Sequence, residues 1–167
     1  MIAASRIPEP VALGRIYLRT LWRLRLSLLT ISTMLALAFA SRYAGLDSTL
    51  GLAFAHAGWM YPFFGAMLGW LGVFLTGSDT SANALFGNLQ VVTAGRLGLD
   101  PVLMAASNSS GGVMGKMISL QSIAVAAAAT GMKSEDEAKL FRFTLKHSII
   151  LASAIGLITM LYSHLAR

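Results

Sequence analysis

Apolar residues fill most of this chain in long blocks, and polar residues interrupt the blocks at a few places. The first block, residues 21–43, is followed by Asp47 and carries Arg42 near its end. A helix rises about 1.5 Å per residue, so about twenty residues cross the ~30 Å hydrocarbon layer of a bilayer. The pattern therefore predicts a membrane-spanning helix over residues 21–43 and another over residues 147–165.

Two polar, glycine-rich segments, residues 76–83 and 107–116, interrupt the apolar sequence between these spans. The first segment contains Asp79, and the second contains Lys116 and three glycines. Polar backbone and ionisable side chains at membrane depth are costly unless they line a solvated or ligand-filled cavity. A pair of such breaks is typical of the binding site of a secondary transporter. We therefore expect the two segments to face each other near the bilayer midplane.

The regions around the two interruptions predict a hairpin and a broken helix. Residues 50–97 are interpreted as a re-entrant hairpin with residues 77–80 at its tip. Residues 101–130 are longer than one crossing needs, which favours two half-helices around an unwound centre formed by the second interruption. In an alternative topology, residues 59–75 cross completely and residues 101–130 form an inward-side hairpin. The alternative agrees equally well with the charges.

Three local signals predict where helices begin or end. Pro62 indicates a bend or a helix end near Met60, because proline removes a backbone donor and clashes with the preceding turn. Pro101 is well placed as a first helical residue. Ser134 is followed by three acidic residues, which is the pattern of an N-cap with acids in the first turn of a helix.

The composition and the charge distribution also point to a bilayer. Of the 167 residues, 56% are hydrophobic and 12% are charged, whereas a soluble domain carries about a quarter charged residues. Basic residues gather at the N-terminus and again over residues 133–146. Lys and Arg are enriched on the cytosolic side of membrane proteins, so we place both regions there. We divide the chain into a basic cytosolic lead-in, residues 1–20, and a membrane domain, residues 21–167.

Several function classes have no support in the sequence. The chain has no cysteine, and its three histidines form no metal-binding motif, so we expect neither a metal site nor a cofactor. No nucleophile–base pair indicates an enzyme. The net charge of +6 follows the positive-inside pattern, and the chain lacks the polar domain that base recognition needs. We therefore expect a non-enzymatic membrane protein that does not bind nucleic acid.

The segment GSDTSANALFGNLQ, residues 77–90, resembles the C-terminal part of the L-lactate permease family. Three further stretches agree with the family pattern, at residues 68–75, 108–126 and 140–148. The resemblance runs from about Leu21 to Leu165 and corresponds to about the last third of a family member. Residues 1–20 do not match the pattern, and Leu120 stands where proline is expected.

The resemblance implies a large polytopic carrier of the bacterial inner membrane that takes up L-lactate, D-lactate and glycolate with protons. Such carriers are thought to be built of inverted repeats. The chain is then an all-α membrane protein that forms half of an inverted-repeat carrier. Its partners would be lactate, protons, the lipid bilayer, and the missing N-terminal repeat or a second subunit. The alternative is a non-transporting truncated fragment with a scaffold or interaction role.

The polar residues of both interruptions are the candidate substrate site. They are Ser78, Asp79, Thr80, Ser81, Asn83, Asn108, Ser109, Ser110, Gly111, Gly112, Lys116, Gln121 and Ser122. Asp79 either caps the helix that follows or carries the coupled proton, and the two roles are compatible. Lys116 either binds the lactate carboxylate as a point charge or extends its ammonium group to the lipid headgroups. The glycines serve either an unwound backbone or close helix packing.

Overall fold

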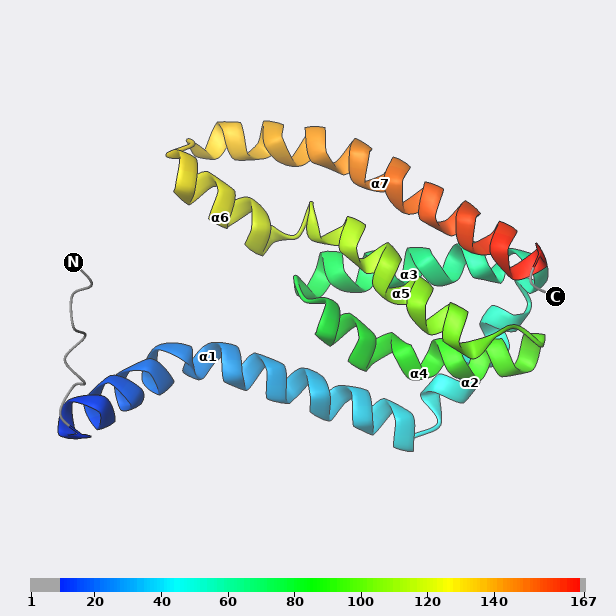
Figure 1. The fold of residues 1–167 in the computed structure, drawn as a ribbon, viewed down its shortest axis with the longest axis horizontal. Coiled ribbons are helices and arrows are strands. Elements are labelled where there is room, and N and C mark those ends of the chain that lie inside the picture. The colour runs from blue at the N-terminus through cyan, green and yellow to red at the C-terminus, as the bar shows by residue number, and fades with distance from the viewer. Residues whose placement is uncertain (1–9, 166–167) are drawn as a thin grey trace, which may run out of the picture. The chain divides into compact units, whose positions relative to one another are not determined.

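The structure is a computed structural model that describes residues 10–165, and within this range it is helical throughout, without strands. The elements are α1 Pro10–Tyr43, α2 Leu46–Ala55, the 3-10 helix η1 Gly58–Met60, α3 Tyr61–Thr76, α4 Asp79–Leu97, α5 Pro101–Lys116, α6 Leu120–Thr130 and α7 Ser134–Leu165 (Figure 1). The prediction of an all-α protein is confirmed.

The chain divides into two units, residues 1–34 and residues 35–167. The described part of the first unit is the N-terminal part of α1, whose described side chains are exposed. This helix includes residues 10–20, so the predicted boundary between the lead-in and the first span falls inside one helix. Residues 1–9 of the predicted lead-in lie outside the described residues.

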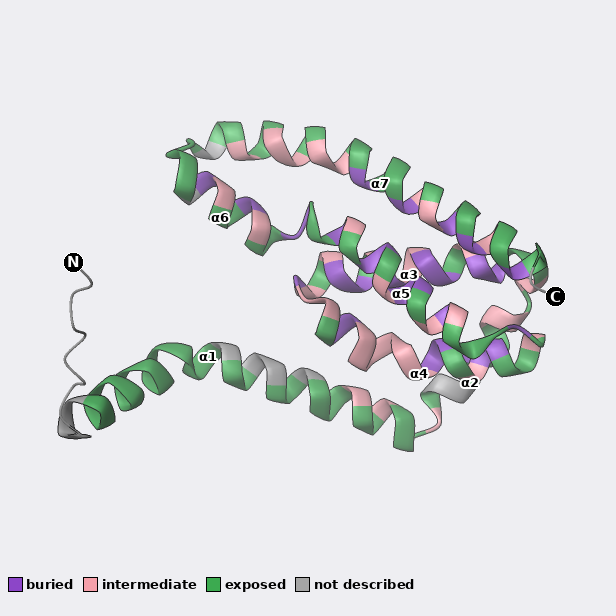
Figure 2. Ribbon diagram, viewed as in Figure 1, coloured by how far each residue is buried: buried purple, intermediate pink, exposed green. Residues whose placement is uncertain are grey.

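Helix α3 is the centre of the second unit, and α4, α5 and α7 pack around it. Figure 2 shows the buried residues concentrated on the faces that α3, α4 and α5 turn to one another. Glycines allow this close approach: a Cβ on Gly69 would overlap the backbone of Asn108, and one on Gly111 would overlap the backbone of Ala66. Small residues have the same role at helix contacts in lipid, where the hydrophobic effect does not drive helices together.

Helices α3 and α4 form a hairpin that turns at Gly77 and Ser78. Gly77 has φ 68°, a left-handed conformation that favours glycine, and ends α3. The Ser78 side chain caps α4 by accepting a hydrogen bond from the Ser81 amide. The predicted hairpin tip is therefore correct in position, while its re-entrant course in a membrane stays a prediction. Pro62 lies in the first turn of α3, so the predicted helix end near Met60 is confirmed.

The second interruption is not unwound, which corrects the prediction for residues 107–116. Helix α5 continues through this segment to Lys116, and the chain leaves the helix only at residues 117–119. Gly111 and Gly112 have ordinary helical backbone and are buried against α3, because a helix contact needs their small size. Residues 101–130 are thus two helices, as predicted, but the break lies at residues 117–119, after the polar segment.

Helix α7 combines the polar run and the last predicted span in one helix, Ser134–Leu165. Three acids occupy its first turn as predicted, while the side chain of Ser134 lies outside the described ones. Two segments among the described residues are long and apolar enough to cross a membrane, Gly58–Thr76 and Glu135–Leu165. The second includes the predicted span over residues 147–165.

Candidate functional site

Asp79, in the first turn of α4, is the acidic centre of a polar cluster between α4 and α5. Its Oδ2 atom accepts hydrogen bonds from the Asn83 amide at 3.0 Å and from the Ser109 hydroxyl at 3.1 Å. Its Oδ1 atom is buried and has no hydrogen-bond partner among the described residues. A Cβ on Gly112 would lie 2.7 Å from Oδ1, so only glycine lets α5 pack this closely against the carboxylate. The carboxylate therefore has one oxygen with two hydrogen bonds and one buried oxygen without a partner among the described residues.

A chain of side-chain hydrogen bonds extends from Asp79 into the core. Asn83 Oδ1 accepts a bond of 2.8 Å from Asn108 Nδ2, and Asn108 Oδ1 accepts one of 3.1 Å from Gln90 Nε2. Gln90 Oε1 accepts a bond of 2.8 Å from the Tyr61 hydroxyl. Tyr61, Gln90 and Asn108 are each 0% exposed. The chain links α3, α4 and α5 through groups that water does not reach.

The carbonyl of Gly65 fixes the direction of this chain. A carbonyl oxygen only accepts hydrogen bonds, and Gln90 Nε2 donates to it at 2.8 Å. Gln90 must therefore present Nε2 to Asn108 as well, and Asn108 must present its own NH₂ group to Asn83. The NH₂ group of Asn83 then faces Asp79. Every donor in this series of hydrogen bonds, from Tyr61 to Asn83, thus points toward the Asp79 carboxylate.

Lys116 joins the two interruptions at a second place. Its Nζ donates to the carbonyl of Gly77 and lies 3.4 Å from Gln121 Oε1. The Gln121 side chain also lies against Gly77, because a Cβ on that glycine would be 2.9 Å from Oε1. The contacts of Asp79 and of Lys116 therefore bring the two segments together, as predicted from the sequence.

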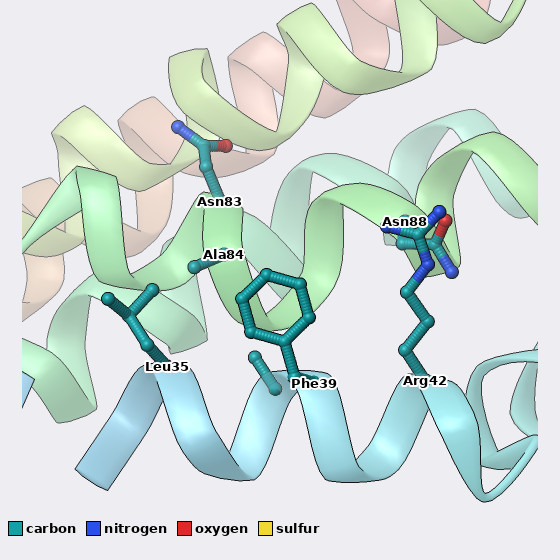
Figure 3. A pocket seen from close by; sticks show the side chains of 7 residues that line it. Leu35, Phe39, Arg42, Asn83, Ala84 and Asn88 are labelled. Carbon is teal, nitrogen blue, oxygen red and sulfur yellow. The ribbon is translucent and has the colours of Figure 1, made fainter. Parts of the chain in front are cut away.

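A hollow of about 250 Å³ lies beside the polar cluster (Figure 3). It is lined by Leu35, Ala38, Phe39, Arg42, Asn83, Ala84 and Asn88. In Figure 3, Leu35, Phe39 and Arg42 extend from α1 toward α4, and Arg42 reaches to the level of Asn88. Asn83 belongs both to this hollow and to the hydrogen bonds of Asp79. A ligand in the hollow would therefore lie one side chain away from the carboxylate.

Comparison with known proteins identifies the family. A family model described as L-lactate permease matches residues 3–166. The chain belongs to the L-lactate permease family. It is 55% identical over 149 residues to glycolate permease GlcA of Escherichia coli (strain K12), covering 89% of this chain and 26% of that protein. It is 54% identical over 151 residues to L-lactate permease of Bacillus subtilis (strain 168), covering 90% of this chain and 27% of that protein.

L-lactate permease of Escherichia coli (strain K12) is 54% identical over 145 residues, which cover 87% of this chain and 26% of that protein. The chain thus spans about a quarter of the length of the curated relatives it matches. No solved structure matches.

The remaining predicted site residues of this L-lactate permease family member lie around the cluster without contacting Asp79. Ser78 and Ser81 form the start of α4, so the capping role considered for Asp79 belongs to Ser78. The Ser110 hydroxyl bonds to the carbonyl of Ala106, four residues earlier in α5. Thr80 is exposed, Gly111 packs against α3, and Ser122 bonds to the Ser119 cap of α6.

Three residues of the site were missing from the sequence-based set: Gln90, Tyr61 and Arg42. Gln90 follows Asn83 by seven residues, which is two helical turns, so the two amides share one face of α4. This spacing was the available signal for Gln90. Arg42 was interpreted as the end of the first span, and no local pattern distinguishes that role from a place in a pocket. Tyr61 is a single aromatic residue in an apolar stretch, so the sequence carries no signal for it.

Proposed function

We propose that this chain is part of a proton-coupled carrier of small 2-hydroxy monocarboxylates, with L-lactate, D-lactate and glycolate as substrates. Family membership supports the proposal, as do the names of two relatives, an L-lactate permease and a glycolate permease. Lactate and glycolate share a carboxylate and a neighbouring hydroxyl group. We place the chain in the bacterial inner membrane as a multi-pass protein, with Glu135–Leu165 among its spans. Gly58–Thr76 is a further span in the alternative topology, in which residues 59–75 cross completely.

The observation that carries the proton-coupling part is the free Oδ1 of Asp79. A proton on this oxygen neutralises the carboxylate, while the donors on Oδ2 remain in place. No described basic side chain forms an ion pair with Asp79, since the one ion pair in the described region joins Lys139 and Asp136. In this proposal, a proton neutralises the Asp79 carboxylate in place of a basic side chain. A carboxylate that loses its charge on loading crosses a low-dielectric region at a lower cost.

The polar cluster of Asp79, Asn83, Asn108 and Ser109 forms the core of the proposed substrate site. Its amide and hydroxyl groups offer both donors and acceptors, which a hydroxyl-bearing anion requires. Gly112 packs against Asp79 Oδ1 and Val73, where no larger side chain fits. Lys116 supports this site by holding the α3–α4 turn in place through the Gly77 carbonyl.

A second candidate function is a non-transporting fragment that packs against other membrane proteins. The match covers 26% of one relative's length and 27% of the other's. This favours the second candidate, because an inverted-repeat carrier needs both repeats to complete its site. In the carrier proposal, the missing N-terminal repeat or a second subunit supplies the other half. The two proposals differ in whether this chain transports alone.

Uptake of labelled L-lactate into vesicles separates the proposals. Vesicles that contain the chain alone, with an inward proton gradient, are expected to accumulate lactate above empty vesicles. Asp79→Asn keeps the shape of the side chain and removes its proton affinity, so uptake is expected to lose its dependence on the gradient. Asp100→Asn, at the exposed N-terminus of α5, is the matched control. No uptake by the chain alone would favour the fragment, and gradient-driven uptake by Asp79→Asn would exclude the proton role of Asp79.

A further inference from the structure

We propose that the hollow between the end of α1 and α4 binds the substrate carboxylate, and that Arg42 is its cationic partner. The inference rests on the proposed function for the class of ligand, a small monocarboxylate. It adds a binding place for the carboxylate and names Arg42 as its ion-pair partner, a role that the sequence analysis considered for Lys116.

Arg42 has the right chemistry for a carboxylate ligand. Its planar guanidinium group presents donors in a fork that matches the two oxygens of a carboxylate. Among the side chains that the structure describes, none forms an ion pair with Arg42. The residue is exposed, so a ligand can reach the guanidinium group.

The rest of the lining fits a small organic acid rather than an inorganic anion. Leu35 and Phe39 on α1 and Ala84 on α4 give the hollow apolar surfaces, on which a methyl group can pack (Figure 3). Asn88 adds an amide group on the α4 side. The volume of about 250 Å³ leaves room for a molecule of a few heavy atoms with some water. Carboxylate, hydroxyl and alkyl group thus each have a matching surface.

The position of Asn83 connects this pocket to the proton site. Asn83 is one of the lining residues, and its amide points away from α1, where Nδ2 donates to Asp79 Oδ2 (Figure 3). A ligand in the hollow therefore lies against the residue whose amide holds the Asp79 carboxylate. This shared residue is a physical route by which substrate binding and protonation of Asp79 influence each other.

Two other places are less suited to the carboxylate. Lys116 already binds the Gly77 carbonyl and lies beside Gln121, so its ammonium group is engaged in holding the turn. A second hollow, of about 260 Å³, is lined by apolar and aromatic residues of α2 and α3. Its lining consists of Phe54, Phe64, Met67, Leu68, Trp70 and Leu71. None of these side chains carries a positive charge.

Binding of L-lactate and glycolate to the full chain in lipid nanodiscs tests the inference by titration calorimetry. Arg42→Gln is expected to weaken binding at least about tenfold, since it removes a charge-assisted bidentate contact. Arg42→Lys keeps the charge without the fork and is expected to give an intermediate affinity. Arg96→Gln, an exposed arginine in the last turn of α4 outside the hollow, should leave the affinity within about twofold.

A second variant keeps the test valid if a change at Arg42 disturbs the fold. Ala84→Phe fills the hollow and leaves the guanidinium group in place, so it is expected to abolish binding of both acids. Unchanged affinity in Arg42→Gln or in Ala84→Phe would overturn the pocket, as would absence of binding to the unmodified chain. The carrier proposal is decided separately, by gradient-driven uptake and its loss in Asp79→Asn.

Discussion

Replacing Gln90 with leucine tests whether the buried amide chain holds the three central helices together. The side chain is 0% exposed and makes three hydrogen bonds, to the Tyr61 hydroxyl, the Gly65 carbonyl and the Asn108 side chain. Leucine has a similar volume and no polar atom. Gln90→Leu therefore removes the hydrogen-bond partner of three buried groups. These are the Tyr61 hydroxyl and the Gly65 carbonyl on α3 and the Asn108 side chain on α5.

The expected loss of stability follows from these three groups. Leaving a buried donor or acceptor without its partner costs about 1–3 kcal/mol for each group in soluble proteins. Interhelical hydrogen bonds in a membrane protein average only about 0.6 kcal/mol, because the unfolded chain in the membrane also finds partners. Three bonds at this lower value give about 2 kcal/mol. We expect Gln90→Leu to lower the free energy of unfolding by about 2 kcal/mol or more.

The assay is reversible unfolding of the detergent-solubilised chain in SDS, followed by circular dichroism. Gln121→Leu is the matched control, because Gln121 is exposed and lies outside the chain of amides. It is expected to change the unfolding free energy by about 0.5 kcal/mol or less. Tyr61→Phe removes only the first bond and should cost about 1 kcal/mol. Equal stability of Gln90→Leu and Gln121→Leu would show that the amide chain does not stabilise the helix contacts, and would refute the reasoning.

Two further changes probe the packing and the turn. Gly69→Ala places a Cβ against the backbone of Asn108 and should destabilise the chain by about 3 kcal/mol or more in the same assay, whereas Gly95→Ala, with open space around it, should be neutral or stabilising by up to about 1 kcal/mol. Destabilisation of equal size in both variants would contradict the close approach of α3 and α5. Lys116→Met removes the ammonium group from the Gly77 carbonyl, so hydrogen exchange of the turn amides should become faster. Unchanged exchange there would show that Lys116 does not hold the turn.

The features of the fold that depend on local chemistry could be predicted from the sequence. Pro62 and Pro101 begin helices because proline suits the first turn and no later one, whatever the surroundings. Gly77 ends α3 because its positive φ is a backbone property of the turn itself. The acids at the start of α7 interact with the dipole of their own helix. None of these signals requires knowledge of a neighbouring helix.

The course of the second interruption could not be predicted, because glycine has two opposite uses. In an isolated chain, Gly111 and Gly112 weaken a helix, and this property favoured an unwound segment. In the structure, α3 presents the backbone of Ala66 at the place where a side chain of Gly111 would be. The gain from close packing then exceeds the loss in helix propensity. Which use prevails depends on α3, which is distant from α5 in sequence.

The candidate site shows the same division between local and tertiary information. The seven-residue spacing of Asn83 and Gln90 places both amides on one face of α4, so an amide pair was open to prediction. The direction in which these amides donate was not, since it is fixed by the backbone carbonyl of Gly65, which no side-chain pattern records. This direction brings two donors to Oδ2 of Asp79 and none to Oδ1. If this series of hydrogen bonds ran in the opposite direction, Asn83 would present its oxygen to Asp79. The carboxyl group would then need a proton on Oδ2 to form that hydrogen bond. The observed direction removes that requirement, because the two bonds that hold Asp79 both end on Oδ2 and come from donors.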